Sequence, residues 1–244
     1  MFGISEQRFY DDCELMFKLV HPDNFEEFYK KTTGQFEYSK KQVVRFRHSN
    51  GKYISTEDFA TPIYDKSGRL IGIEGSHRDI TERIKLEKEL EYRGNHDKMT
   101  GTYNRDFFEE YSDNLDKQVD SKVGIIVCDL NGLKSLNDNF GHKYGDLMII
   151  ESGKLLNKYS SENIIVSRIG GDEFSIILTG VDEIYVSNMI KSINEDIIKF
   201  NESSEEIKNN MSIGFAVAQN SLNNMNLLFI MADKRMYQEK KAMK

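Results

Sequence analysis

The chain has 244 residues, and 33 basic against 40 acidic side chains give it a formal net charge of −7. With 39% hydrophobic and 30% charged residues, it has the composition of a globular protein with one large or two small domains, which excludes a disordered or fibrous chain. The acidic balance argues against a nucleic-acid partner and against an anionic membrane surface, both of which require basic patches. We expect a cytoplasmic protein, since the sequence has neither a signal-peptide pattern nor an apolar run of the roughly 18–20 residues that span a membrane.

The first 80 residues predict a helix followed by an antiparallel meander. Pro22 begins a helix that continues to about Lys31, because proline is tolerated in the first turn. Asn50-Gly51 predicts a tight hairpin turn with positive φ at both residues. The predicted strands of the meander are Val43–Ser49, Tyr53–Tyr64 and Arg69–Arg78.

A helix is predicted from residue 80 to residue 93, and Asp79 is placed to cap it. Its apolar residues recur at helical spacing: Ile80, Ile84, Leu86 and Leu90. The stripe is too short to establish a coiled coil. A helix packed on its own domain and a dimerising linker helix explain it equally well.

The remaining residues alternate strands and helices, which is typical of an α+β or α/β fold. The predicted strands are Lys122–Asp129, Ile164–Ile169, Phe174–Leu178 and Met211–Ala218. The predicted helices are Gly145–Tyr159, Ile184–Phe200 and Leu227–Lys241. Cys128 lies inside an apolar run, which predicts a buried, reduced thiol.

Asp129 is the first candidate functional residue, because it ends an apolar strand. Such strand ends bind ligands in open sheets, and a following turn with successive free N–H groups can bind phosphate. Lys134, five residues later, would place a positive charge beside the phosphate. A simple cap for the next helix explains Asp129 as well, so this segment alone does not establish a site.

The second candidate is the string Arg168-Ile169-Gly170-Gly171-Asp172-Glu173-Phe174, in which two glycines lie between apolar strands. Its two glycines let a ligand approach the backbone closely. Successive residues of a strand point to opposite faces, so either Asp172 or Glu173 would face Asp129 on a neighbouring strand. Carboxylates that converge in this way suit Mg²⁺, although an ordinary acidic hairpin would have the same sequence.

From about Asp97 to Lys244, the chain resembles the GGDEF-domain family of diguanylate cyclases, whose signature string stands at residues 170–174. Residues 97–105, 129–146, 212–214 and 232–240 resemble the family's other blocks, in the right order and spacing. The resemblance implies a nucleotidyl-cyclase palm-like central sheet surrounded by helices. It also implies that two GTP condense to cyclic di-GMP with release of two pyrophosphates. Each site would hold one GTP, so the expected species is a homodimer, with cyclic di-GMP receptors as indirect partners.

The same resemblance assigns roles to individual residues. Mg²⁺, or Mn²⁺ in its place, would be held by Asp129, the carbonyl of Leu130, Asp172 and Glu173. Asp172 or Glu173 would assist deprotonation of the attacking hydroxyl, and Lys134 would stabilise the transition state. The expected substrate contacts are Gly132, Leu133, Asn137, His142, Asp146, Gly170, Gly171, Lys240 and Lys244.

One departure from the family concerns regulation by product. Many members carry an R-x-x-D product-binding motif that ends five residues before the signature. The corresponding stretch here is Ser161-Glu162-Asn163-Ile164, in which both charged residues are replaced. We therefore expect no product-inhibition site.

Residues 1 to about 80 resemble the C-terminal part of a PAS sensor domain, with 81–96 as a signalling linker helix and 97–244 as the catalytic domain. The PAS sheet has five strands, of which the first two would precede Phe2. The expected fold is therefore an incomplete antiparallel PAS-like sheet joined to an α+β or α/β catalytic domain.

Two alternatives to an active diguanylate cyclase remain at this point. One is a catalytically silent GGDEF module that binds GTP or a protein partner. The other is a nucleotidyl cyclase with the same palm-like chemistry and a mononucleotide product. The intact signature and Asp129 favour an active enzyme, while Asn137 and Asp146 favour guanine without deciding the product.

Overall fold

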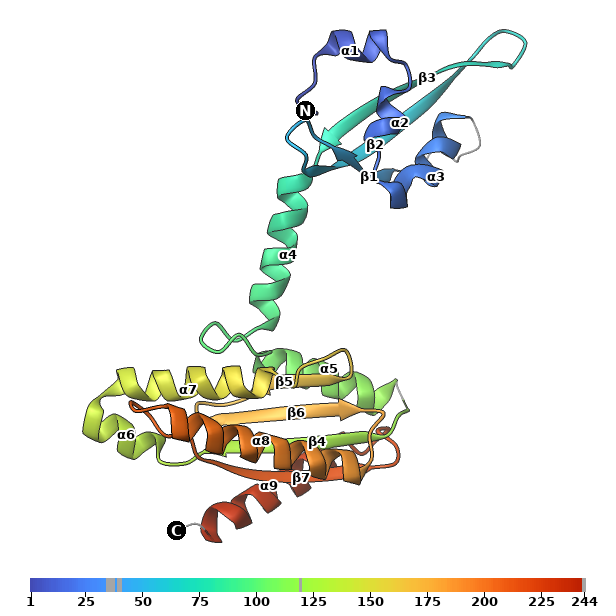
Figure 1. Ribbon diagram of the computed structural model, residues 1–244. Helices are drawn as coiled ribbons and strands as arrows, with labels where there is room; N and C mark the ends of the chain where they lie inside the picture. The colour runs from blue at the N-terminus through green and yellow to red at the C-terminus, as the bar shows by residue number, and fades with distance from the viewer. Residues whose placement is uncertain (34–37, 39–40, 119, 243–244) are drawn as a thin grey trace. The chain divides into compact units, whose positions relative to one another are not determined.

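A computed structural model describes residues 1–33, 38, 41–118 and 120–242 (Figure 1). The chain divides into two compact units, Met1–Glu91 and Tyr92–Lys244. Among the described residues, no helix combines the length and the apolar composition needed to cross a bilayer.

The N-terminal unit packs short helices against an antiparallel sheet in the order β1-β2-β3. Its strands are β1 (Gln42–Arg47), β2 (Tyr53–Tyr64) and β3 (Leu70–Asp79), which confirms the predicted meander. Its helices are α1 (Glu6–Asp11), α2 (Leu15–Leu19) and α3 (Pro22–Thr32). Val44 and Phe46 alternate with exposed positions on β1 and pack with Phe28 of α3 in the core of the unit.

The β1–β2 turn corrects one prediction. Gly51 has a φ of 85°, whereas Asn50 does not have a positive φ. The N–H of His48 bonds to the carbonyl of Lys52 (2.8 Å), and the N–H of Gly51 bonds back to the carbonyl of His48 (2.9 Å). Three residues thus form the loop, and a loop of this length needs left-handed backbone only at its last position.

Helix α4 (Thr81–Asn95) begins where predicted and crosses the boundary between the two units. The carboxylate of Asp79 accepts the N–H of Thr81 (2.9 Å), so Asp79 does bind a backbone donor at the helix start, as expected. Ile80 is buried, whereas Leu86 and Leu90 are exposed. Only the first residue of the predicted apolar stripe is therefore fully covered within the chain.

The C-terminal unit is built on an antiparallel sheet with the order β5-β6-β4-β7. The strands are β4 (Val123–Leu130), β5 (Ile164–Arg168), β6 (Glu173–Thr179) and β7 (Met211–Ala218). Every residue of β4 is buried, because this strand has a neighbour on each side and helices on both faces. Cys128 is among these residues, and burial raises the pKa of its thiol to about 12, in agreement with a reduced cysteine.

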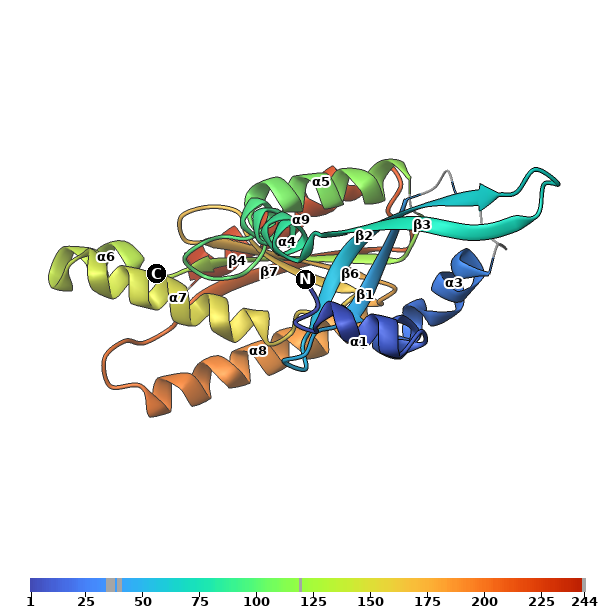
Figure 2. The ribbon, with the colours of Figure 1, turned by 90° about the horizontal axis from the view of Figure 1, so that it is seen from above.

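Alternate residues of β4 belong to two separate cores. Ile126 and Cys128 pack with α7 (His142–Asn157) and α8 (Glu183–Ser203), whereas Ile125 and Val127 pack on the opposite face. That second core contains residues of α5 (Arg105–Lys117) and α9 (Met225–Ala242). Figure 2 shows the resulting layers, with α5 and α9 on one side of the sheet and α7 and α8 on the other. A central sheet surrounded by helices is the fold predicted from the sequence.

Four helices were not predicted: the short α1 and α2 of the N-terminal unit, and α5 and α6 of the C-terminal unit. Helix α5 follows Asn104, whose side chain accepts the N–H of Phe107 (2.9 Å). Helix α6 (Leu133–Phe140) lies between two glycines with positive φ, Gly132 (81°) and Gly141 (89°). It is only eight residues long, so hydrophobic periodicity gives little signal for it. Helix α7 consequently begins at His142, three residues before the predicted start.

Candidate functional site

Strand pairing brings two distant carboxylates together. In the register of β4 and β6, Asp129 lies directly opposite Glu173. Directly opposed residues of an antiparallel pair project on the same face. Glu173 is therefore the residue that shares a face with Asp129, whereas Asp172 precedes β6 and its carbonyl accepts the N–H of Leu130 (2.9 Å). The sequence left this choice open, because it does not specify the register.

The charges at this end of the sheet repel one another. Burial raises the pKa of Asp129, and the nearby Asp172 and Asp233 raise it further while Lys240 opposes the change. Burial also raises the pKa of Glu173, assisted by the charges of Asp129, Asp172 and Asp233. Four carboxylates thus share a partly desolvated region, which favours a cation.

Lys240 provides a positive charge within this region. From α9, its Nζ lies 2.5 Å from Oδ1 of Asp129, and the Asp129 side chain is only 8% exposed. The expected role of Lys240 was a phosphate contact, whereas here its ammonium group neutralises a carboxylate. Lys244, the other expected basic contact, lies outside the described residues.

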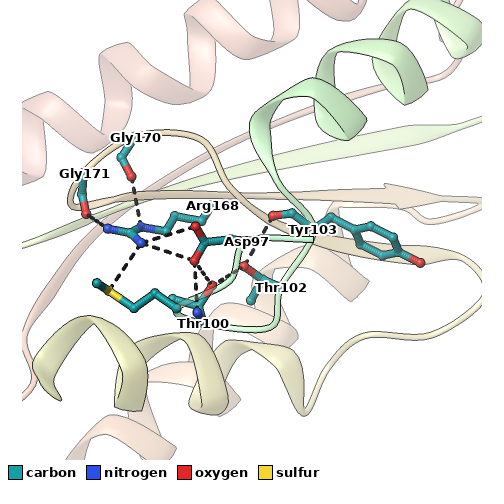
Figure 3. Close-up of polar contacts among 8 residues, drawn as sticks. Asp97, Thr100, Thr102, Tyr103, Arg168, Gly170 and Gly171 are labelled. Carbon is teal, nitrogen blue, oxygen red and sulfur yellow. Dashed lines mark hydrogen bonds and ion pairs between the residues drawn. The ribbon is translucent and has the colours of Figure 1, made fainter. Parts of the chain in front are cut away.

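The Gly170-Gly171 turn is held by Arg168, the last residue of β5 (Figure 3). Its Nε donates to the carbonyl of Gly170 (3.2 Å) and its Nη2 to that of Gly171 (2.8 Å). The third nitrogen, Nη1, lies 3.2 Å from Oδ1 of Asp97. Asp97 is fixed in turn by the hydroxyl (2.7 Å) and the N–H (2.9 Å) of Thr100. One guanidinium therefore connects the segment after α4 to the turn that precedes Asp172.

The turn after β4 carries the expected phosphate-binding residues. Gly132 has a φ of 81° and an open space where a side chain would stand. Leu133 and Lys134 form the start of α6, where backbone N–H groups have no partner within the helix, and Lys134 is exposed. The positions are compatible with an anion approaching this turn.

The three expected base-contacting residues lie on α6 and α7. Asn137 packs against Gly145, where any side chain would collide with its amide. Its Oδ1 is buried with no hydrogen-bond partner among the described residues. His142 and Asp146 are exposed, and Asp146 lines a cavity of about 350 Å³ together with Tyr144 and Glu206. Asn137 is not among the residues that line this cavity.

Comparison with models of known protein families agrees with this arrangement of carboxylates and turns. A family model described as "Diguanylate cyclase, GGDEF domain" matches residues 94–244. The chain belongs to the GGDEF family. A second model, described as "PAS fold", matches residues 1–77.

Curated proteins similar to this chain include two from one bacterium. The probable diguanylate cyclase DgcT of Escherichia coli K12 is 26% identical over 67% of this chain and 36% of its own length. The cyclic di-GMP phosphodiesterase PdeR of the same organism is 26% identical over 68% of this chain and 26% of its own length. The chain thus spans about a third or less of these curated relatives.

Among solved structures, the coiled coil and GGDEF domain of DgcB from Caulobacter crescentus, in complex with c-di-GMP, is similar with a TM-score of 0.58. The match covers 66% of this chain and 88% of that chain at 19% identity, which shows the fold.

The GGDEF site has a donor set that fits a hard divalent cation. The carboxylates of Asp129, Asp172 and Glu173 and the carbonyl of Leu130 are all oxygen ligands, and their mutual repulsion would be relieved by a cation. Among the described residues, however, no three His, Cys, Asp or Glu side chains are already arranged around one point. Because Asp129 is bonded to Lys240, a metal ion would compete with this ammonium group.

Two residues of the site received no role from the sequence. Arg168 fixes the GGDEF turn, and Asp233 contributes charge to both central carboxylates. Asp233 and Glu173 also line a cavity of about 670 Å³ beside α5 and α9. Asp233 lies seven residues before Lys240, and this two-turn spacing puts both on one face of α9, which is the signal that could have identified it.

Proposed function

We propose that the C-terminal unit is a diguanylate cyclase that condenses two GTP to cyclic di-GMP and two pyrophosphates. The observation that carries this proposal is the pairing of Asp129 with Glu173 beside the Arg168-held Gly170-Gly171 turn. This pairing gathers carboxylates at one end of the sheet, as a metal-assisted phosphoryl transfer requires. Membership of the GGDEF family supports the reaction class.

In the proposed reaction, the 3′-oxygen of each GTP attacks the α-phosphorus of the other. A P–O bond forms to the 3′-oxygen, the bond to the bridging oxygen of pyrophosphate breaks, and the hydroxyl proton passes to Asp172 or Glu173. Repeating the step in the second half of the dimer closes the ring. Lys134, at the start of α6, is the residue proposed to stabilise developing negative charge.

The nucleotide would be held by the backbone of two turns. Gly132 and Leu133 offer N–H groups at the start of α6, and Gly171 leaves the GGDEF turn open to a phosphate, whereas the space beside Gly170 is filled by the side chain of Glu173. Asn137, His142 and Asp146 are proposed guanine or ribose contacts, since the amide and carboxylate groups complement the N1–H and amino donors of guanine.

Mg²⁺, with Mn²⁺ as the alternative, is the proposed cofactor. When bound, it would neutralise phosphate charge and favour ionisation of the attacking hydroxyl. Asp129, the carbonyl of Leu130, Asp172 and Glu173 are the proposed ligands, and Lys240 would be free to contact a phosphate once the metal replaces it on Asp129.

The proposed working species is a homodimer regulated by the PAS unit through α4, because one site holds only one of the two nucleotides. GTP and Mg²⁺ are both abundant in the cytoplasm, which is where we propose that the reaction occurs. Cyclic di-GMP receptors would then be indirect partners of this protein.

The decisive experiment is incubation of the protein with GTP and Mg²⁺, followed by chromatography and mass analysis of the products. Cyclic di-GMP supports the proposal, and cyclic GMP would indicate a mononucleotide cyclase instead. An absence of turnover would favour a silent GTP-binding module, a second candidate favoured by the occupation of Asp129 by Lys240. The Asp172→Ala variant should be inactive under the same conditions.

A further inference from the structure

A row of aromatic rings extends from the last turn of α4 into α5. The rings of Tyr92 and His96 stack at 3.9 Å between centroids, and those of His96 and Tyr103 lie 4.4 Å apart. Tyr103 stacks on Phe107 at 4.0 Å with an interplanar angle of 13°, and Phe107 is followed by Tyr111 at 6.0 Å. Nothing in the proposed reaction uses these rings, and all of them lie in the C-terminal unit.

The middle of this ring row is bonded to the strand that ends in Arg168. Tyr103 donates its N–H to the carbonyl of Val166 (2.9 Å), and the N–H of Arg168 donates to the carbonyl of Tyr103 (2.8 Å). His96 and Tyr103 also pair as an isolated bridge. A shift of the last turn of α4 therefore moves rings whose backbone is fixed to Arg168.

Arg168, whose backbone is bonded to Tyr103, in turn holds the Gly170-Gly171 turn through its side chain. Its guanidinium donates to the carbonyls of both Gly170 and Gly171, while Asp97, next to His96 in the chain, holds the opposite side of the group (Figure 3). The side chain of Arg168 is only 14% exposed, so it has little freedom to take another position. Within the described part of the chain, the backbone bonds that also hold the turn run from the N–H groups of Ile169 and Gly170 to the carbonyl of Glu173 (3.0 and 3.3 Å).

We propose that Arg168 is a positioning residue for the Gly170-Gly171 turn and that the ring row from Tyr92 to Tyr103 fixes it to the end of α4. The proposal rests on the proposed function for its consequence in catalysis. A displacement at Tyr92 changes the turn that precedes Asp172 and Glu173, and so changes their position relative to Asp129. The ring row thereby gives α4 a physical route to the reacting groups within one protomer.

The test compares the full chain with its Tyr92→Leu and Tyr92→Phe variants by hydrogen–deuterium exchange. Leucine keeps an apolar side chain but removes the stacking ring, whereas phenylalanine keeps the ring. We expect Tyr92→Leu to speed exchange of the amides in residues 168–173 by about fivefold, and Tyr92→Phe to exchange like the wild type. Tyr185→Leu is the matched control, because Tyr185 is 48% exposed on α8 and Tyr92 is 55% exposed.

A second variant, Arg168→Lys, keeps the charge beside Asp97 and loses the planar group that reaches both carbonyls. It should speed exchange in the same segment and lower kcat by about tenfold or more, with the KM for GTP within about twofold of wild type. Unchanged exchange of residues 168–173 in Tyr92→Leu overturns the proposal. Faster exchange over the whole C-terminal unit also overturns it, because the ring would then stabilise the fold in general.

The exchange measurement does not depend on turnover. If the wild type makes no cyclic di-GMP, the proposed function fails, while the exchange of residues 168–173 still decides whether Tyr92 and Arg168 position the turn.

Discussion

Lys240 on the last helix is paired with Asp129 on the central strand, with Nζ and Oδ1 2.5 Å apart. The pair joins the C-terminal helix α9 to the middle of the sheet and places a cation where the family resemblance expects a metal ion. Removal of the cation beside a buried carboxylate is costly unless another cation replaces it. Lys240 and a divalent cation would therefore compete for one oxygen.

The first prediction concerns this competition. The Lys240→Met variant should lose about 2 kcal/mol of stability without metal, because Asp129 is left buried and unpaired. Mg²⁺ should then raise the thermal midpoint of Lys240→Met more than that of the wild type, in which the metal must displace an ammonium group. Thermal unfolding with and without MgCl₂ measures this difference. Lys234→Met, an exposed lysine of the same helix, should respond to Mg²⁺ like the wild type.

A second prediction distinguishes a specific role of Asp172 in catalysis from the effect of removing any one negative charge from the C-terminal unit. Asp172→Asn should lower the rate of cyclic di-GMP formation by about a hundredfold or more, since it removes a proposed metal ligand or proton acceptor. Steady-state rates with GTP and Mg²⁺ test this. Asp138→Asn, which neutralises an exposed carboxylate on α6, should keep the wild-type rate; equal losses in both variants would argue against a specific role for Asp172.

The sequence predicted the strands well because buried strand residues are apolar, either at alternate positions as in β1 or in a continuous run as in β4. Tyr53–Tyr64 and Met211–Ala218 are found with the predicted bounds. The helix at residues 105–117 was missed although Phe108 and Leu115 of it are buried, and the eight-residue α6 was too short to show a period. The positive φ predicted for Asn50 was wrong, because the φ of this residue depends on the length of the loop, which the register of β1 and β2 sets.

The sequence predicted which residues make up the candidate site, but it did not predict which of them contact one another. Motifs in the sequence identify Asp129, Asp172 and Glu173, but the register that sets Asp129 opposite Glu173 is a property of the folded sheet. The pairing of Lys240 with Asp129 spans 111 residues of sequence, and no local pattern encodes it. Arg168 was assigned no role either: its bonds to Gly170 and Gly171 are local, but its ion pair with Asp97 spans 71 residues of sequence.

The third prediction concerns Asp97, which holds Arg168. Burial alone would raise the pKa of Asp97, but the hydrogen bonds from Thr100 and the charge of Arg168 outweigh burial and hold this pKa below its usual value. A depressed carboxyl pKa adds stability at pH values above its unfolded pKa, and this stability is lost as the pH falls through the folded pKa. Asp97→Asn should therefore lower the free energy of unfolding by about 2 kcal/mol at pH 7.

The difference between wild type and Asp97→Asn should shrink as the pH falls below about 5. Urea unfolding of both proteins at neutral and acidic pH measures this trend. Asp120→Asn, at an exposed position, serves as the control. A stability difference that is the same at every pH would show that the Asp97 carboxylate charge contributes nothing.

The fourth prediction is that cyclic di-GMP does not inhibit through the stretch Ser161–Ile164. This stretch forms a tight turn before β5, with the N–H of Ser161 bonded to the carbonyl of Ile164 (3.0 Å), and it contains no arginine to bind a phosphate bidentately. Initial rates at several GTP concentrations with added cyclic di-GMP test it. Competitive inhibition at the substrate site is compatible with the prediction, whereas strong non-competitive inhibition contradicts it.

The last prediction concerns the exposed residues of α4. Leu86 is 51% and Leu90 is 68% exposed, and their spacing of four residues puts them on one face of the helix. Burial of both leucines between two copies of α4 would stabilise a dimer, so the double variant Leu86→Glu/Leu90→Glu should weaken association by at least about tenfold. Sedimentation velocity measures the association, and turnover per chain should fall with it.

Lys88→Glu provides the control for this change. It lies about 200° around the helix from Leu86, so it adds negative charge on the opposite face and should leave association unchanged. Raising the protein concentration should restore turnover of the double variant if dimerisation is the step that was lost, because association depends on concentration and damage to the site does not. A double variant that sediments and turns over like the wild type would show that the face containing Leu86 and Leu90 is not the dimer contact.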